Sequence, residues 1–240
     1  MSTQSHRTVL VTGGARGIGA GIARSFAEAG FNVMIGDLSV PGDWSYGLAG
    51  ADDADKVAEG LGEHGVRSRA VPLDVSDPES CQDAVAATLE SFGRLDVLVN
   101  NAGLVQSGPL SSYDPATLER LFAVNVMGGF YMTQAAEEAL KASKGAVINI
   151  ASIAGKKGYP NMSAYCATKF AVVGFTQSMA QELAEHGVRV NALCPGIVGT
   201  AMWIDHLLAD TSHERGARER EFERRMIERI PLSRPQTVED

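Results

Sequence analysis

The stretch Thr12-Gly-Gly-Ala-Arg-Gly-Ile-Gly19 decides the fold, because it sets three glycines between an apolar run and a segment with helical periodicity. The run before it, TVLVTG, has the short β-branched pattern of a buried strand. Gly13, Gly17 and Gly19 permit a tight turn and a close approach of the backbone to a ligand. The start of the following helix offers free N–H groups to a pyrophosphate. The spacing is not GxGxxG, but its place between strand and helix predicts a dinucleotide-binding loop.

Around this loop, short apolar runs alternate with longer helical segments, which is the pattern of successive βαβ units. Because the runs are apolar throughout, they indicate a parallel sheet that helices cover on both faces. No repeat or linker divides the chain, so we expect a single domain over residues 1–240. Strands are expected at 8–13, 31–37, 69–75, 95–100, 146–151 and 188–193, and helices at 19–30, 54–65, 79–92, 115–142 and 163–186.

Two segments depart from this alternation. Residues 39–53, SVPGDWSYGLAGADD, are rich in Gly, Asp and Pro and are typical of a loop inserted after the second strand. Such a loop is either a lid or a surface excursion, and we favour the excursion because long surface insertions cost little. Residues 206–229 are dense in Arg and Glu with apolar residues between them. We expect them to belong to a mobile flap, from about 197 to 230, that orders over bound ligands.

The composition limits the classes of partner. A net charge of −8 and a pI near 5.2 oppose binding to nucleic acid or an anionic membrane, which need a concentrated basic field. No apolar run approaches the ~20 residues that span a bilayer, and the N-terminus lacks the regions of a signal peptide. Three cysteines without CxxC spacing and five scattered histidines predict free thiols and no metal site. We therefore expect a cytoplasmic protein with a small-molecule partner.

Polar residues follow several of the expected strands. Asp37 ends the second strand, where its carboxylate can accept hydrogen bonds from ribose hydroxyls, although an Asp at a strand end can also simply cap a turn. Asp74-Val75 ends the third strand and Asn100–Gly103 ends the fourth. In open α/β sheets, ligands bind at this rim of carboxyl ends.

Tyr165 and Lys169, in the stretch YCATK, are one helical turn apart and can point to the same side of a helix. Such a pair is common by chance, so it needs context. The context is the order of motifs along the chain: TGGARGIG at 12–19, Asp37, Asp74-Val75, NNAG at 100–103, Asn125, Ser152, YCATK at 165–169 and Pro195-Gly196. In this order the sequence resembles the short-chain dehydrogenase/reductase family, in its compact single-domain form.

The resemblance covers nearly the whole chain. It implies a three-layer α/β, Rossmann-like fold with a mostly parallel, doubly wound sheet of seven strands, and a nicotinamide cofactor. The implied catalytic set is Asn125, Ser152, Tyr165 and Lys169. The implied cofactor contacts are Gly13, Arg16, Gly17, Ile18, Gly19, Asp37, Leu38, Asp74, Val75, Asn101, Ala102, Gly103, Tyr165, Lys169, Pro195, Gly196, Val198 and Thr200. The expected substrate contacts, which indicate a mainly apolar pocket, are Ser152, Ala154, Tyr159, Tyr165, Met202 and Trp203.

A free tyrosine has a pKa of about 10, too high for an efficient base at neutral pH. The resemblance implies that the charge of Lys169, helped by that of the oxidised nicotinamide, favours the phenolate of Tyr165, and that the Lys169 amine also holds the nicotinamide ribose. It further implies that Ser152 hydrogen-bonds the substrate oxygen and that Asn125 holds a water of the proton relay. Alternatively, Ser152 only caps a turn and Asn125 only satisfies a kinked helix. Cys166 has no identifiable basic partner and is expected to be a packing residue.

Asp37 also bears on the choice between NAD and NADP. A carboxylate that holds the ribose 2′-hydroxyl would repel the 2′-phosphate of NADP, so we expect NAD. Arg16 could offer a cation to that phosphate, but it can instead neutralise the pyrophosphate, and no second basic residue follows Asp37 in DLSVPGDW.

The expected reaction is reversible oxidation of a secondary alcohol to a ketone. Alternatives on the same fold are an NADP-dependent ketone reductase, a dehydratase or epimerase, and a cofactor-sensing protein without catalysis. The run VGTAMW at 198–203 is loosely similar to members that act on small diols, acetoin or sugar alcohols. The resemblance also implies a homo-oligomer, either a tetramer or a dimer. It implies a further helix and strand after Asp240, so these C-terminal family elements are expected to be missing from this sequence.

Overall fold

The computed structural model describes residues 6–40, 44–208 and 214–240, so residues 41–43 of the insertion and 209–213 of the flap lie outside the described residues. Strands and helices alternate along the chain as the sequence predicts. The strands are β1 (Thr8–Thr12), β2 (Asn32–Asp37), β3 (Ser68–Pro72), β4 (Val97–Asn100), β5 (Ala146–Ile150) and β6 (Arg189–Leu193). The longer helices are α1 (Gly17–Glu28), α2 (Ala51–Leu61), α3 (Pro78–Phe92), α4 (Pro115–Phe122), α5 (Gly128–Ser143), α6 (Ser163–Glu182) and α7 (Arg215–Arg229).

The strands form a parallel sheet in the order β3-β2-β1-β4-β5-β6. The chain therefore winds from β1 to one edge and then crosses back to build the other half, which confirms the doubly wound α/β fold. Within the described residues the sheet has six strands, one fewer than the family resemblance implies. The strand β6 is its edge, because no described segment pairs with the far side of this strand.

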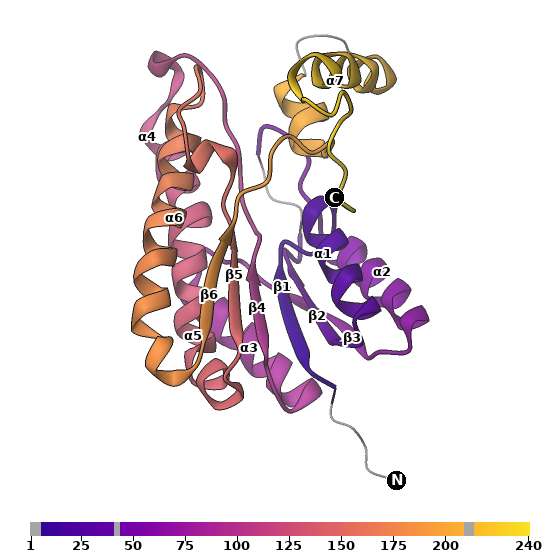
Figure 1. Cartoon of the computed structure of the whole chain (residues 1–240), viewed down its shortest axis with the longest axis vertical. Coiled ribbons are helices and arrows are strands. Elements are labelled where there is room, and N and C mark those ends of the chain that lie inside the picture. Colours follow the sequence, from indigo (N-terminus) through magenta and orange to yellow (C-terminus); the bar gives the residue numbers. More distant parts are fainter. Residues whose placement is uncertain (1–5, 41–43, 209–213) are drawn as a thin grey trace.

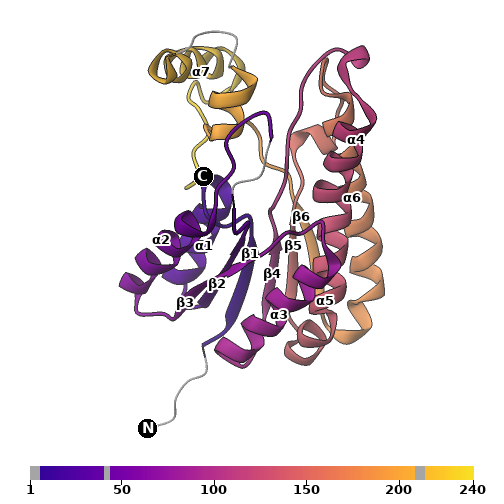
Figure 2. The same ribbon diagram turned by 180° about the vertical axis from the view of Figure 1, so that it is seen from behind.

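Alternate side chains of the central strands enter two separate apolar cores. Val9 and Val11 of β1 pack with residues of α1 and α2, whereas Leu10 packs with residues of α3, α5 and α6 on the opposite face. All three side chains are fully buried. Figures 1 and 2 show the resulting layers, with α1 and α2 on one side of the sheet and α3, α5 and α6 on the other. Burial on both faces explains why the strands are continuously apolar.

The helix expected over 115–142 is interrupted. The helix α4 ends at Phe122, a π-helical turn spans Ala123–Met127, and α5 begins at Gly128. The helical segment expected around 115–142 is therefore confirmed, but the sequence did not predict the π turn inside it, because a single inserted π turn leaves the apolar periodicity on either side intact. Such turns often occur at functional sites, and this one contains Asn125.

The helix α2 begins earlier than expected, at Ala51 rather than at 54. Asp52 and Asp53 lie in its first turn, where carboxylates interact favourably with the positive end of the helix dipole. The side chain of Asp53 also accepts a hydrogen bond from the Gly50 N–H at 3.3 Å. The insertion after β2 is therefore shorter than the predicted range 39–53.

The flap packs as a small unit above the carboxyl ends of the strands, where α7 lies (Figure 1). Its buried apolar residues Leu208, Phe222 and Met226 pack against one another. Asp205 joins its two halves through ion pairs with Arg215 at 2.8 Å and Arg218 at 3.0 Å. Several apolar residues of this charged segment therefore find their partners within the flap itself. Across the described part of the chain, no helix is long and apolar enough to cross a membrane.

Candidate active site

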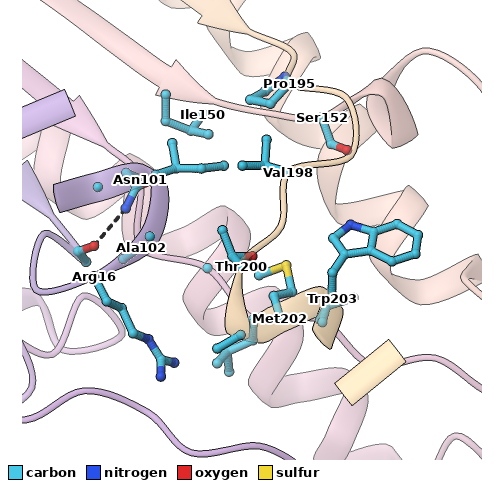
Figure 3. A pocket seen from close by; sticks show the side chains of 18 of the residues that line it. Arg16, Asn101, Ala102, Ile150, Ser152, Pro195, Val198, Thr200, Met202 and Trp203 are labelled. Atoms are coloured by element: carbon cyan, nitrogen blue, oxygen red, sulfur yellow. Dashed lines mark hydrogen bonds between the residues drawn. The ribbon is translucent and has the colours of Figure 1, made fainter. Parts of the chain in front are cut away.

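A pocket of about 600 Å³ lies at the rim formed by the carboxyl ends of the strands. Every cofactor and substrate contact expected from the sequence lines this pocket. Figure 3 shows how separate segments meet there, with Arg16 and Asn101 on one side and Ser152, Met202 and Trp203 on the other. Asn125 instead lines a small adjoining cavity.

The glycine loop supplies a cradle of backbone. Gly13 and Gly17 adopt φ values of +62° and +52°, in the left-handed region that favours glycine. A Cβ atom on Gly19 would lie 2.2 Å from the carbonyl oxygen of Gly13, which no side chain could tolerate. No side chain caps the start of α1 and its first turn holds no acidic residue, whereas Asp77 and Asp114 cap α3 and α4. These features fit the pyrophosphate of a dinucleotide.

Asn101 fixes the glycine loop to β4. Its side-chain amide donates to the carbonyl oxygens of Thr12 and Gly13, each at 2.9 Å, and Figure 3 shows it turned toward the loop. The hydroxyl of Thr12 accepts the backbone N–H groups of Asn101 and Ala102 at 3.0 Å. The NNAG motif therefore braces the cradle as well as lining the pocket.

Asp37 carries a carboxylate to the same end of the pocket. Its two oxygens accept the N–H groups of Ala15 and Leu38, each at 2.9 Å. Burial raises the pKa of Asp37, while these two hydrogen bonds and the nearby Arg16 act to lower it. Arg16 itself donates to the carbonyl oxygen of Gly47, in the insertion. Arg16, the cation of the glycine loop, is therefore hydrogen-bonded to the insertion. The carboxylate of Asp37 is hydrogen-bonded to the backbone of the glycine loop at Ala15.

The YCATK pair lies inside the molecule. The side chains of Tyr165 and Lys169 on α6 are both buried, and the Lys169 ammonium lies 5.7 Å from the centre of the Tyr165 ring. Lys169 Nζ donates to the carbonyl oxygen of Ile150 at 2.9 Å. Ser152 follows β5, where its hydroxyl accepts the Ala154 N–H at 3.1 Å and also hydrogen-bonds Tyr165. Ser152 therefore caps a turn and contacts Tyr165 at the same time. Its interpretation as a turn cap does not exclude its interpretation as a catalytic residue.

Burial dominates the ionisation of this pair. It raises the pKa of Tyr165 to about 12, with the hydrogen bond from Ser152 acting in the opposite direction. It lowers the pKa of Lys169 to about 8. In the protein alone, burial therefore raises the pKa of Tyr165 instead of lowering it, and the expectation, which also counted the charge of the oxidised nicotinamide, stays a prediction for the complex. Loss of hydration disfavours the charged form of both groups and outweighs their mutual attraction.

Asn125 is buried and held on both sides. Its amide nitrogen donates to the Leu104 carbonyl at 2.8 Å and to the Thr168 hydroxyl at 3.1 Å, and its oxygen accepts the Leu104 N–H at 2.7 Å. The π turn thus ties α6 to the segment after β4. The cavity beside Asn125 and Lys169 measures about 10 Å³, which is enough for one water molecule.

The insertion after β2 lies against the pocket rather than on the surface. Tyr46 is only 6% exposed and belongs to the same apolar cluster as Ala154 and Tyr165. The indole N–H of Trp44 donates to the Val105 carbonyl at 2.9 Å. The expectation of a surface excursion is therefore wrong. The sequence feature that indicated burial was the presence of Trp44 and Tyr46 in a segment otherwise rich in Gly, Asp and Pro, since aromatic side chains stabilise a fold when they are buried.

Other pocket residues carry no sequence motif. They come from the segments after β2, β4 and β5 and from α4 and the flap, and tertiary structure alone brings them together. They include Leu48, Ala49, Leu104, Val105, Arg120, Val124, Ile153, Met162, Ile197, Leu207, Arg215 and Arg229.

Comparison with known proteins agrees with this geometry. A family model described as short chain dehydrogenase matches residues 7–209. The chain belongs to the short-chain dehydrogenase family. An L-2,3-butanediol dehydrogenase of Corynebacterium glutamicum is 40% identical over 98% of this chain and 88% of its own length. A sorbitol dehydrogenase of Cereibacter sphaeroides is 36% identical, over 98% of this chain and 86% of its own.

A solved structure extends the comparison. A Sinorhizobium meliloti protein assigned to the short-chain alcohol dehydrogenases superposes with a TM-score of 0.82 at 32% identity, over 98% of this chain and 85% of its own. This dehydrogenase is therefore an oxidoreductase that acts on CH–OH groups and the corresponding ketones, with a nicotinamide dinucleotide as its cofactor.

Proposed function

We propose that this protein is an NAD-dependent dehydrogenase that interconverts a small secondary alcohol and its ketone, with Tyr165 as general acid and base. The observation that carries the proposal is the meeting of Tyr165, Lys169 and Ser152 at one buried end of the pocket whose other end is the glycine cradle. A phenol, an ammonium and a hydroxyl so arranged suit proton transfer to and from a carbonyl oxygen.

Each side chain has one task in ketone reduction. The nicotinamide, when bound, supplies the hydride that attacks the carbonyl carbon. Tyr165 donates its proton to the carbonyl oxygen, and its raised pKa keeps that proton in place at neutral pH. Ser152 hydrogen-bonds the same oxygen and stabilises the developing alkoxide. The ammonium of Lys169 stabilises the phenolate that remains, and Tyr165 takes the proton back in alcohol oxidation.

Asn125 has a positioning role in this scheme. Its hydrogen bonds to Leu104 and Thr168 hold the π turn against α6, next to the cavity that reaches Lys169. A water in that cavity would connect Lys169 to the backbone of the turn and so supply protons to the pair.

The preference for NAD follows from Asp37. Its carboxylate lines the dinucleotide end of the pocket, where a 2′-phosphate would meet a like charge. Arg16, the residue that could offset that charge, donates to Gly47 and has its guanidinium 5.9 Å from the centre of the Tyr46 ring. Both observations favour NAD over NADP.

The substrate class follows from the walls of the catalytic end. Ala154, Tyr159, Met202 and Trp203 make it mainly apolar, which suits a small alcohol better than a fully hydroxylated chain. A diacetyl reductase of Staphylococcus epidermidis, 38% identical over 82% of this chain and 73% of its own, and the butanediol dehydrogenase carry names that agree with such a substrate. Small diols, hydroxyketones and diketones are therefore the proposed substrates.

Assembly and location complete the proposal. Phe122, Met127, Phe130 and Phe170, on the layer of α4 to α6, expose large apolar side chains. Such a surface favours association with a second copy, as a dimer or within a tetramer. The described cysteines are free thiols, two of them buried, which suits the cytoplasm.

A panel of secondary alcohols and ketones, each tested with NAD(H) and NADP(H), tests the function. We expect turnover of short diols or diketones, with kcat/KM at least about ten-fold higher for NAD than for NADP. Binding of NADH without turnover of any compound would indicate a cofactor-sensing protein instead. A preference for NADP would overturn the role given to Asp37.

A further inference from the structure

Residues 44–49 of the insertion, which we call the strap, are tethered along their length. The Trp44 indole donates to the Val105 carbonyl at 2.9 Å, and the Val105 N–H donates to the Tyr46 hydroxyl at 3.4 Å. Arg16 donates to the carbonyl of Gly47. The strap therefore runs from the glycine loop to the segment after β4 and is held at both.

Tyr46 lies among the residues that surround the reacting carbon in the proposed function. It is buried in one apolar cluster with Val105, Ala154, Tyr165 and Cys166. Partly buried residues pack against this cluster, and they are Trp44, Leu48, Tyr159, Met162, Met202 and Leu207. Four members, Ala154, Tyr159, Tyr165 and Met202, are substrate contacts expected from the sequence. The strap thus adds Tyr46 and Leu48 to the walls of the catalytic end, and Trp44 packs against the same cluster.

A wall of this kind discriminates by size. The tethers prevent the aromatic ring from withdrawing freely, and an apolar ring offers no hydrogen-bonding surface to a chain of hydroxyl groups. A methylene group that a tight pocket cannot accommodate lowers kcat/KM by about ten-fold or more. The position of Tyr46 therefore bears on which groups can flank the reacting carbon.

We propose that Tyr46 is a specificity-determining residue whose ring closes the substrate end of the pocket and restricts this dehydrogenase to compounds with a short apolar arm on the reacting carbon. The inference rests on the proposed function, because it takes Tyr165 as the marker of that carbon.

Vicinal diketones of increasing length provide the test, since only one arm changes. The substrates are 2,3-butanedione, 2,3-pentanedione and 2,3-heptanedione, each reduced with NADH, and the readout is the kcat/KM ratio of the longest to the shortest. In Tyr46→Ala this ratio should rise about ten-fold or more over that of the wild type. Tyr46→Phe loses the weak hydrogen bond from Val105 but keeps the ring and the tethers at Trp44 and Gly47, so it should hold the ratio within about two-fold of the wild type.

Two further variants serve as a replacement for Tyr46→Ala and as a control. Tyr46→Leu, which fills part of the space, should give an intermediate ratio and replaces Tyr46→Ala if that variant does not fold. Val40→Ala changes an exposed side chain of the same insertion and should leave both rates unchanged. A ratio within about two-fold of the wild type in both Tyr46→Ala and Tyr46→Leu would overturn the proposal. So would a change confined to NADH affinity, because the strap would then cover the cofactor alone.

The wild-type protein separates failure of the proposed function from failure of the size selection. If it turns over no ketone, the size selection is measured by binding. Trp44 and Trp203 are the chain's two tryptophans, and both pack against residues of this pocket. Their fluorescence reports diketone binding to the NADH complex, and the ratio of dissociation constants then replaces the ratio of kcat/KM with the same expected and contradicting results.

Discussion

The two ends of the pocket are built from different materials. The dinucleotide end is mostly backbone, in which Gly13, Gly17 and Gly19 create space and the start of α1 presents N–H groups. The catalytic end is made of side chains such as Tyr165 and Ser152, which come from separate elements and are buried together. In the proposed function, binding of the cofactor thus depends on the absence of side chains, whereas the proton transfer depends on side chains that are buried together.

Charge differs between the ends in the same way. Burial raises the pKa of Asp37 as well, but hydrogen bonds from two backbone N–H groups and the nearby Arg16 act to hold its charge. At the catalytic end, burial acts against the charged forms of both Tyr165 and Lys169. Burial of these ionisable groups at the catalytic end therefore lowers the stability of the fold while it keeps the groups together. Each end of the pocket can be disrupted by its own substitution.

At the dinucleotide end, the largest effect is expected from Gly19→Ala. Its Cβ would meet the Gly13 carbonyl oxygen at 2.2 Å, so the loop must move. NADH affinity, measured by fluorescence titration, should fall about hundred-fold, because small misplacements of a binding loop have large effects. Gly60→Ala is the matched control, since a Cβ there meets nothing within 4 Å. Equal NADH affinities in the two variants would contradict the cradle.

At the catalytic end, Lys169→Met should stabilise the fold while abolishing turnover. The lowered pKa of Lys169 shows that burial disfavours its charge, so an apolar side chain of similar size should raise the free energy of unfolding at pH 7 by about 1–3 kcal/mol. Urea unfolding at pH 7 measures this gain, with the exposed Lys56→Met as control. A less stable Lys169→Met protein would show that the ammonium contributes net stability where it lies.

The same pair of proteins carries a pH dependence with a definite sign. The folded pKa of Lys169 is about 8, against an ordinary value of 10.5, so between these values the unfolded chain binds the extra proton. The wild-type free energy of unfolding should therefore rise with pH from about 8. Above about pH 10 Tyr165 opposes this rise, since the unfolded tyrosine then loses its proton first. Lys169→Met should lack the rise, and an equal rise in both proteins would assign it to another group.

The smallest effect is expected from Asp37→Ala, which removes one hydrogen bond to the glycine loop and should relax the choice of cofactor. The ratio of kcat/KM for NAD over NADP should fall about ten-fold for each 1.4 kcal/mol of repulsion removed. Asp55→Ala removes the same charge from an exposed position on α2 and serves as control. A ratio unchanged in Asp37→Ala would place the source of selectivity elsewhere.

The sequence predicts the dinucleotide end better than the catalytic end. Glycine spacing and the apolar strands are local features, so the cradle and the doubly wound sheet are visible without coordinates. Burial is not local, which is why the strap was expected at the surface and the pKa of Tyr165 was expected to fall. The sequence did not predict the π turn at 123–127, because the helices on either side of it keep the same apolar periodicity.

The central claim is that Tyr165 performs the proton transfer at a site that the cofactor cradle does not share. Tyr165→Phe tests it most directly, because the ring still packs while the hydroxyl is lost. We expect kcat for ketone reduction to fall about thousand-fold, which is within the usual contribution of a general acid or base. The dissociation constant of NADH should stay within about two-fold of the wild type. Retention of a tenth or more of wild-type kcat would contradict the claim.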